Sequence, residues 1–212
     1  MHNKIIYWLK IFTLSYAFFF FASCYSNSKE EAAPVEIYDH TTPNLLPALE
    51  TISVFTKSKK EFVITEDETS ASISDISVIG NGFGAFNEPI IIGETDPIEN
   101  QFIADLDNDG FDELYIVTRS VGSGSYAGLL GIASLNDKSY TVINIQQPES
   151  HDAIMQGYRG HDTYTVKDNA LQRRFPVYDN DAANSEPGSN QALIEYTLHK
   201  EGSIVTLTFK NK

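Results

Sequence analysis

The sequence predicts an all-β protein, an antiparallel β-sandwich with a small β-barrel as the alternative. Apolar and polar residues alternate, most clearly in Tyr140–Ile145 and Ile204–Phe209, as in half-buried strands. Turn residues separate these short segments at regular intervals. No segment keeps a helical period over three turns, and the absence of an internal repeat counts against a β-propeller. Regularly spaced short strands favour a sandwich or a barrel.

Short segments rich in β-branched and aromatic residues are the expected strands. They are Ile52–Thr56, Glu61–Thr65, Ile76–Ile79, Pro89–Ile92, Phe102–Ala104, Glu113–Arg119, Leu129–Leu135, Tyr140–Ile145, Thr163–Lys167, Leu171–Tyr178, Ala192–His199 and Ile204–Phe209. The expected turns between them are Asn81-Gly82, Asn108-Asp109-Gly110, Asn136-Asp137, Asp168-Asn169, Pro187-Gly188 and Glu201-Gly202.

Residues 1–23 have the features of a lipoprotein signal peptide. Lys4 and Lys10 form its positive start, and the apolar run Ile11–Ala22 is too short for a stable membrane span. Ala22 and Ser23 are narrow residues directly before Cys24, as a lipoprotein signal peptidase requires. Cys24 is the only cysteine of the chain, so no intramolecular disulfide can form. We therefore expect Cys24 to carry a lipid.

The expected lipid places the protein in the bacterial cell envelope, periplasmic or surface-exposed, and holds it at a membrane without spanning it. Residues 24–48 contain Ser, Asn, Glu, Ala and Pro with little periodicity, which is typical of a flexible tether. Residues 49–212 are long enough for one domain with a proper core. They form the expected β-sandwich domain.

The chain is strongly acidic. Removing residues 1–23 removes two lysines and no acid, so the formal charge changes from −14 to −16. Such a surface is a poor partner for nucleic acid and attracts cationic proteins or metal ions. Simple solubility explains the same charge equally well.

Carboxylates on alternate residues mark a candidate metal loop. Asp105, Asp107 and Asp109 precede Gly110, and Asp112 and Glu113 follow. Calcium binds several oxygens at about 2.4 Å, which alternate residues of a tight loop can supply. An EF-hand would need a glutamate where Ile116 stands, so the spacing fits better the D-x-D-x-D-G-x-x-[DE] loop of some β proteins. A metal-free acidic turn stays open as the alternative, and the sequence requires no other cofactor.

Ser123-Gly124-Ser125-Tyr126 is a candidate binding loop. Its glycines allow a tight turn and close approach of another backbone. Tyrosine is a rigid amphipathic anchor of the kind found at binding hot spots. The loop lacks the lysine and spacing of a phosphate-binding loop and lacks the G-x-S-x-G elbow. A hairpin loop whose tyrosine packs back onto the sheet is the alternative.

His151 and His161 each precede an aspartate, and Ser123 or Ser125 could complete a triad with them. Nothing in the spacing supports that arrangement. His161-Asp162 fits better the role of satisfying buried turn backbone. We therefore predict no catalytic residues and no enzymatic activity.

Several segments together resemble the periplasmic inhibitors of invertebrate-type (i-type) lysozyme. The acidic turn leads into Leu114–Thr118, and Ser123–Tyr126 then resembles that family's S-G-x-Y loop. The downstream matches are a glycine–histidine–aspartate segment at Gly157–Asp162, an R-x-F-P-x-Y strand at Leu171–Tyr178, and a closing turn and strand at Asn184–Gly188 and Ile194–Leu198. They cover about residues 100–200 in order.

The resemblance implies a β-sandwich whose loop enters the substrate cleft of a lysozyme. Ser123 and Tyr126 would donate hydrogen bonds to the two catalytic carboxylates, while Gly124 and Ser125 shape the loop tip. The sequence thus predicts a lipid-anchored lysozyme inhibitor, and a homodimer is compatible with it. One rival is a calcium-stabilised surface module that binds glycan or protein. The other is a hydrolase that uses His161.

Overall fold

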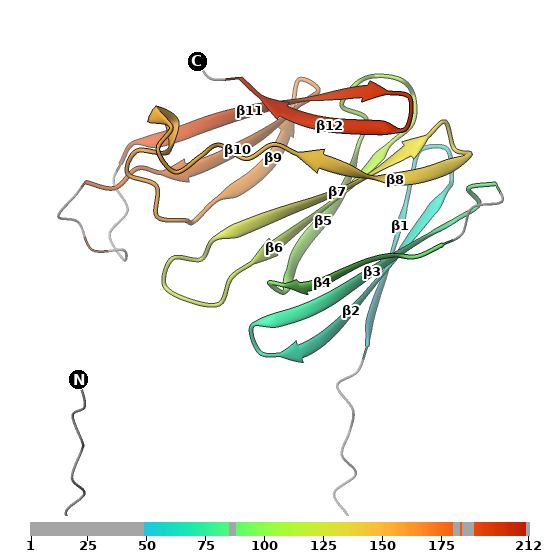
Figure 1. Ribbon diagram of the computed structural model, residues 1–212, viewed down its shortest axis with the longest axis horizontal. Coiled ribbons are helices and arrows are strands. Elements are labelled where there is room, and N and C mark those ends of the chain that lie inside the picture. Colours follow the sequence, from blue (N-terminus) through green and yellow to red (C-terminus); the bar gives the residue numbers. More distant parts are fainter. Residues whose placement is uncertain (1–48, 85–87, 180–182, 184–188, 211–212) are drawn as a thin grey trace, which may run out of the picture. The chain divides into compact units, whose positions relative to one another are not determined.

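Strands make up most of the described chain (Figure 1). The computed structural model describes residues 49–84, 88–179, 183 and 189–210, so the expected signal peptide, the tether and Cys24 lie outside the described residues. Each expected strand overlaps an observed one, and the all-β class is confirmed. The strands are β1 (Glu50–Phe55), β2 (Glu61–Ser70), β3 (Ile73–Asn81), β4 (Ile90–Thr95), β5 (Ile98–Ala104), β6 (Glu113–Arg119), β7 (Ala127–Leu135), β8 (Ser139–Ile145), β9 (Thr163–Lys167), β10 (Ala170–Pro176), β11 (Gln191–Glu201) and β12 (Ile204–Phe209), with one short 3₁₀ turn, η1 (Ala153–Met155).

The strands form two sheets. One has four strands in the order β1-β2-β3-β4, and the other has eight in the order β5-β6-β7-β8-β12-β11-β10-β9. Neighbouring strands are antiparallel except β8 and β12, where Val205 lies opposite Ile143 and Leu207 opposite Ile145 in a parallel register. The antiparallel expectation therefore holds for every other pair of described strands. This parallel pair arises because the chain returns to β8 only after β9, β10 and β11.

Strand β6 lies at the centre of the fold, and both of its faces are buried. Leu114 and Ile116 pack with Phe62 and Ile64 of the four-stranded sheet in one apolar core. Tyr115 and Val117 point to the opposite face, into a second core that includes residues of β10, β11 and β12. The eight-stranded sheet therefore curls over one face of β6 while the smaller sheet covers the other. The fold combines a sandwich with a nearly closed barrel.

The hairpin of β6 and β7 positions the candidate binding loop. Its last residue pair is Arg119 opposite Ala127, so residues 120–126 form the connection between the two strands. Elsewhere, the Asp168-Asn169 turn has positive φ at both residues, as expected for a two-residue hairpin. Within the described ranges no helix is long and apolar enough to cross a membrane.

Candidate binding site at the β6–β7 loop

The connection between β6 and β7 (residues 120–126, here the Tyr126 loop) is closed by its own hydrogen bonds. Ser120 N–H donates to the carbonyl of Tyr126 at 2.8 Å, and Tyr126 N–H donates to Ser120 Oγ at 2.8 Å. Ser125 N–H donates to the carbonyl of Gly122 at 3.1 Å. The side chain of Ser123 is exposed, and Tyr126 is 46% exposed. A defined loop therefore presents both side chains to solvent.

Residues 157–162 (the 157–162 segment) lie directly behind the Tyr126 loop. The backbone N–H of His161 is shared between the carbonyl oxygens of Gly124 at 3.0 Å and Ser125 at 3.1 Å. Gly160 has φ +91°, and a β-carbon there would lie 1.9 Å from the Gly124 carbonyl oxygen. Only glycine permits this approach of the two backbones. The segment thus fixes the side of the loop that faces away from solvent.

Arg119, the last residue of β6, holds the base of the loop. Its Nη1 donates to the Ser125 carbonyl at 2.8 Å, and its Nη2 donates to the Asp162 carbonyl at 2.9 Å. The same guanidinium pairs with Glu99 of β5, at 2.7 Å from Nε and 2.5 Å from Nη2. One side chain therefore joins the loop, the 157–162 segment and the neighbouring strand.

A buried ion pair supports the same region. Arg173 Nε of β10 donates to Asp162 Oδ1 at 2.6 Å, and the two side chains are 6% and 0% exposed. The other oxygen, Oδ2, accepts from the Tyr158 hydroxyl at 2.8 Å and from Ala127 N–H at 3.2 Å. Burial, and then the hydrogen bond to Asp162, raise the pKa of Tyr158, so its hydroxyl remains a donor. Both oxygens of Asp162 are thus satisfied inside the protein.

An aromatic stack backs the tyrosine of the loop. The Tyr126 ring meets Tyr158 edge to face at 5.6 Å between centroids, and Tyr158 meets Phe175 at 4.7 Å. Arg173 lies over the Tyr158 ring at 5.0 Å. The Tyr126 ring is therefore both exposed to solvent and supported from behind. Within the described residues, the hydroxyls of Ser123 and Tyr126 make no hydrogen bond.

Three motifs far apart in the sequence converge here. Ser123–Tyr126, Gly157–Asp162 and the strand containing Arg173 and Phe175 form one hydrogen-bonded and stacked cluster. Arg119 has no signal in the sequence beyond a charge that closes an apolar strand. Its partners lie on β5 and in the 157–162 segment, which no local pattern reveals.

The arrangement does not form a serine–histidine–aspartate relay. His161 Nε2 is buried and has no hydrogen-bond partner in the described part of the chain. Both carboxylate oxygens of Asp162 are bonded to Arg173, Tyr158 and Ala127. The His161-Asp162 pair instead bonds backbone N–H and carbonyl groups of the loop region. A general base oriented toward a serine is missing from this geometry.

The predicted metal residues lie at the other end of β6, which is about 20 Å long for its seven residues. Asp105, Asp107 and Asp109 converge, with one carboxylate oxygen of each within 4.8 Å of the others. Asp112 does not join them, because its carboxylate accepts from Lys57 N–H at 2.6 Å and pairs with Lys57 Nζ at 3.1 Å. Glu113 is buried beside the aspartates, where its pKa is raised to about 8 by burial and by Asp107 and Asp109.

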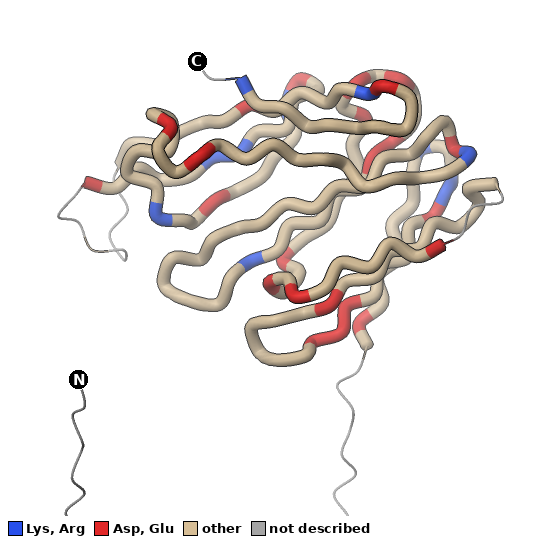
Figure 2. Tube along the Cα trace, viewed as in Figure 1, with Lys and Arg blue, Asp and Glu red and all other residues tan. Residues whose placement is uncertain are grey.

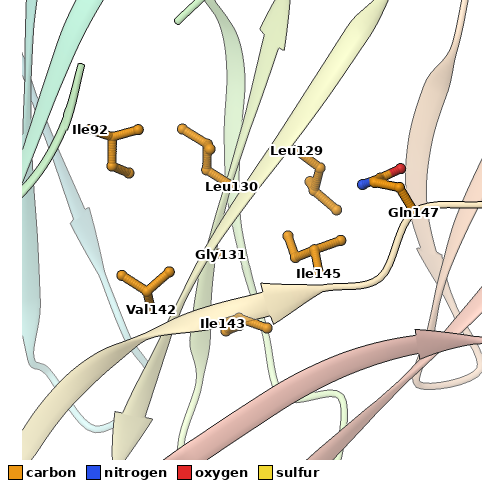
Figure 3. A pocket seen from close by; sticks show the side chains of 8 residues that line it. All are labelled: Ile92, Leu129, Leu130, Gly131, Val142, Ile143, Ile145 and Gln147. Carbon is orange, nitrogen blue, oxygen red and sulfur yellow. The ribbon is translucent and has the colours of Figure 1, made fainter. Parts of the chain in front are cut away.

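A groove of about 290 Å³ lies between β4 and the diverging strands β7 and β8 (Figure 3). Its lining is aliphatic apart from Gly131 and one polar side chain, Gln147. It contains no group for acid–base chemistry. None of its lining residues belongs to the Tyr126 loop.

Comparison with protein-family models found no match, and comparison with characterised proteins found none either. The function is therefore inferred from the site itself.

Proposed function

We propose that this protein inhibits a lysozyme of the i-type by inserting the Tyr126 loop into the enzyme's substrate cleft. The observation that carries the proposal is the loop itself. Ser123 and Tyr126 present hydroxyls that bond to no other residue of the described ranges, while Arg119, Gly160 and His161 hold the loop from behind. Such a loop has hydroxyl donors available for a partner and loses little conformational entropy on binding.

The chemistry of the target fits these donors. Glycosidases of this type place two carboxyl groups on either side of the scissile bond. A hydroxyl donating to a carboxylate makes a charge-assisted hydrogen bond, which is stronger than a neutral one. Tyr126 would reach one carboxylate and Ser123 the other. A loop that fills the cleft in this way also excludes the sugar chain.

Preorganisation supports tight binding by such a loop. Binding a mobile loop costs conformational entropy, about 0.5–1.5 kcal/mol for each side chain immobilised. The Tyr126 ring is already supported by Tyr158, and the backbone of residues 120–126 is already hydrogen-bonded. Much of that cost is therefore met during folding.

Charge and anchoring support the same proposal. Figure 2 shows aspartate and glutamate distributed over the strands and turns of both sheets. The formal charge of the chain from Cys24 onward, −16, would speed the approach of a cationic enzyme. We further propose that a lipid on Cys24 and the tether of residues 24–48 hold the inhibitor at the bacterial envelope, between lysozyme and peptidoglycan.

A turbidity assay tests the proposal. The full-length chain, purified in detergent, is mixed with i-type, chicken-type and goose-type lysozymes and with a bacterial cell suspension. We expect saturable inhibition of the i-type enzyme at one inhibitor per enzyme. Ile91→Ala, which removes a 73% exposed side chain from the four-stranded sheet, serves as the control and should inhibit fully.

The outcomes separate the alternatives. Inhibition of another lysozyme type alone would keep the mechanism and correct the target. Failure to inhibit any of the three would contradict the proposal and favour the surface binding module. In that module the acidic loop matters and Tyr126 is peripheral.

A further inference from the structure

Residues 105–113 (here the acidic loop) connect β5 to the first residue of β6. Four of their carboxyl groups share one pattern of hydrogen bonding. One oxygen of each accepts a backbone N–H of the loop. Gly110 donates to Asp105 Oδ2 at 3.1 Å, Asp109 to Asp107 Oδ1 at 3.2 Å, Phe111 to Asp109 Oδ1 at 2.9 Å, and Leu106 to Glu113 Oε2 at 3.0 Å. The backbone therefore orients all four side chains and leaves one oxygen of each free for another partner.

The remaining oxygens of Asp107, Asp109 and Glu113 face a single cationic group. The Lys200 ammonium of β11 lies 2.5 Å from Asp109 Oδ2, 3.4 Å from Asp107 Oδ2 and 3.9 Å from Glu113 Oε1. Although partial burial lowers the pKa of Lys200, the hydrogen bond to Asp109 and the surrounding charges raise it overall, so the ammonium stays protonated. One monovalent cation thus faces three carboxyl groups.

Two buried oxygens of this group have no hydrogen bond at all. The Glu113 side chain is 0% exposed, and its Oε1 accepts no hydrogen bond from any described residue. The same is true of the buried Oδ1 of Asp105. A buried polar atom without a partner costs about 1–3 kcal/mol, and more when it is charged. A second cation bound beside these two oxygens would offset this cost.

We propose that the acidic loop binds a calcium ion at the position of the Lys200 ammonium, with Asp105, Asp107 and Asp109 as ligands and the buried Glu113 carboxyl group beside them. Two oxygens that each lie about 2.4 Å from one ion are at most about 4.8 Å apart. The three aspartate oxygens meet this limit. Calcium binds about six to eight oxygen ligands in a flexible coordination geometry. Magnesium requires near-octahedral coordination and keeps several of its waters.

Lys200 acts as an internal competitor of the ion. Its ammonium must leave the aspartates before calcium can take their free oxygens, which weakens binding by the wild-type chain. The expected affinity is that of extracellular calcium modules, with Kd of about 0.1–1 mM. Replacing Lys200 by methionine keeps the apolar stem and removes the charge. That variant should bind calcium at least about tenfold more tightly, a difference of about 1.4 kcal/mol.

Calcium-45 equilibrium dialysis of the full-length chain in detergent tests the proposal without any lysozyme. The wild type and Lys200→Met should each bind one ion per chain, the variant more tightly. Lys167→Met removes a charge from β9 and should bind as the wild type does. Asp107→Asn should abolish binding in both backgrounds, and a tenfold excess of magnesium should not displace calcium.

Absence of calcium binding to the wild type and to Lys200→Met at about 10 mM would overturn the proposal. If Lys200→Met does not fold, the wild-type titration decides alone. Unchanged binding by Asp107→Asn, or equal binding of magnesium, would also overturn it. None of these readouts depends on inhibition, so this proposal and the lysozyme proposal can fail separately.

Discussion

Gly160 lies so close behind Gly124 that a β-carbon on Gly160 would stand 1.9 Å from the carbonyl oxygen of Gly124. The same segment donates the His161 N–H to the loop carbonyls. A backbone-to-backbone contact therefore helps to set the shape of the loop, together with the Arg119 guanidinium and the Tyr158 ring. A substitution at Gly160 would therefore act on the Tyr126 loop through the Gly124 backbone.

Gly160→Ala should displace the Tyr126 loop and reduce lysozyme inhibition at least about tenfold, equivalent to about 1.4 kcal/mol of binding. The matched control is Gly202→Ala, which shares a positive φ but has no atom within 4 Å of the added carbon. Gly202→Ala should lose about 1–2 kcal/mol of stability because its φ is positive, and Gly160→Ala should lose more because the added carbon also clashes with the Gly124 carbonyl. Inhibition and denaturant unfolding are measured for each. Equal inhibition by the two variants would contradict the role of the contact.

Asp162→Ala should destabilise the fold by about 3–5 kcal/mol, because it leaves the Arg173 guanidinium buried without its counter-charge. Glu99→Gln is the comparison. It removes the exposed partner of Arg119 and should cost at most about 1 kcal/mol. Urea unfolding of both variants checks the difference. Similar small losses would mean that the Asp162–Arg173 pair is not the support that its burial indicates.

The fold was largely predictable because its signals are local. Alternation and turn residues located each described strand, and the Asp168-Asn169 hairpin followed from its turn chemistry. The outer half of the β2–β3 hairpin was missed because Asp67–Ser70 is polar and exposed, so no buried face leaves a pattern. The parallel pairing of β8 with β12 was missed because it joins strands about 60 residues apart, which alternation does not encode.

The candidate site was predictable in its exposed half only. Ser123 and Tyr126 stand in a local glycine-rich motif that the sequence displays directly. Arg119 and the Asp162–Arg173 pair work through partners on other strands. The competitor role proposed for Lys200 likewise depends on β11 lying beside the acidic loop.

Cys24 should carry a lipid, because narrow residues precede it after an apolar run. Mass spectrometry of the membrane-extracted protein should find diacylglycerol on Cys24 as the first residue. Cys24→Ser should leave the chain unprocessed by the lipoprotein signal peptidase. Recovery of the wild type with an intact, unmodified amino terminus would refute this prediction.

Ser123→Ala should weaken lysozyme binding by about 1–3 kcal/mol if its hydroxyl meets a buried carboxylate. The melting temperature should stay unchanged, since the side chain is exposed and makes no internal hydrogen bond in the described structure. Ser72→Ala, on the exposed β2–β3 turn, is the matched control. Binding is measured by titration calorimetry against the inhibited lysozyme. An affinity equal to that of the control would remove Ser123 from the contact.

Truncation of Tyr126 is the most direct test of the central claim. Tyr126→Ala should cost about 2 kcal/mol or more of binding, roughly a thirtyfold loss of affinity, because a central aromatic anchor is removed. Tyr126→Phe keeps the ring against Tyr158 and removes only the hydroxyl. Its affinity should therefore lie between those of the wild type and Tyr126→Ala. Lysozyme inhibition and melting temperature are measured for the three proteins. We predict that Tyr126→Ala loses inhibition while its melting temperature changes little; full inhibition by Tyr126→Ala would contradict insertion of the loop.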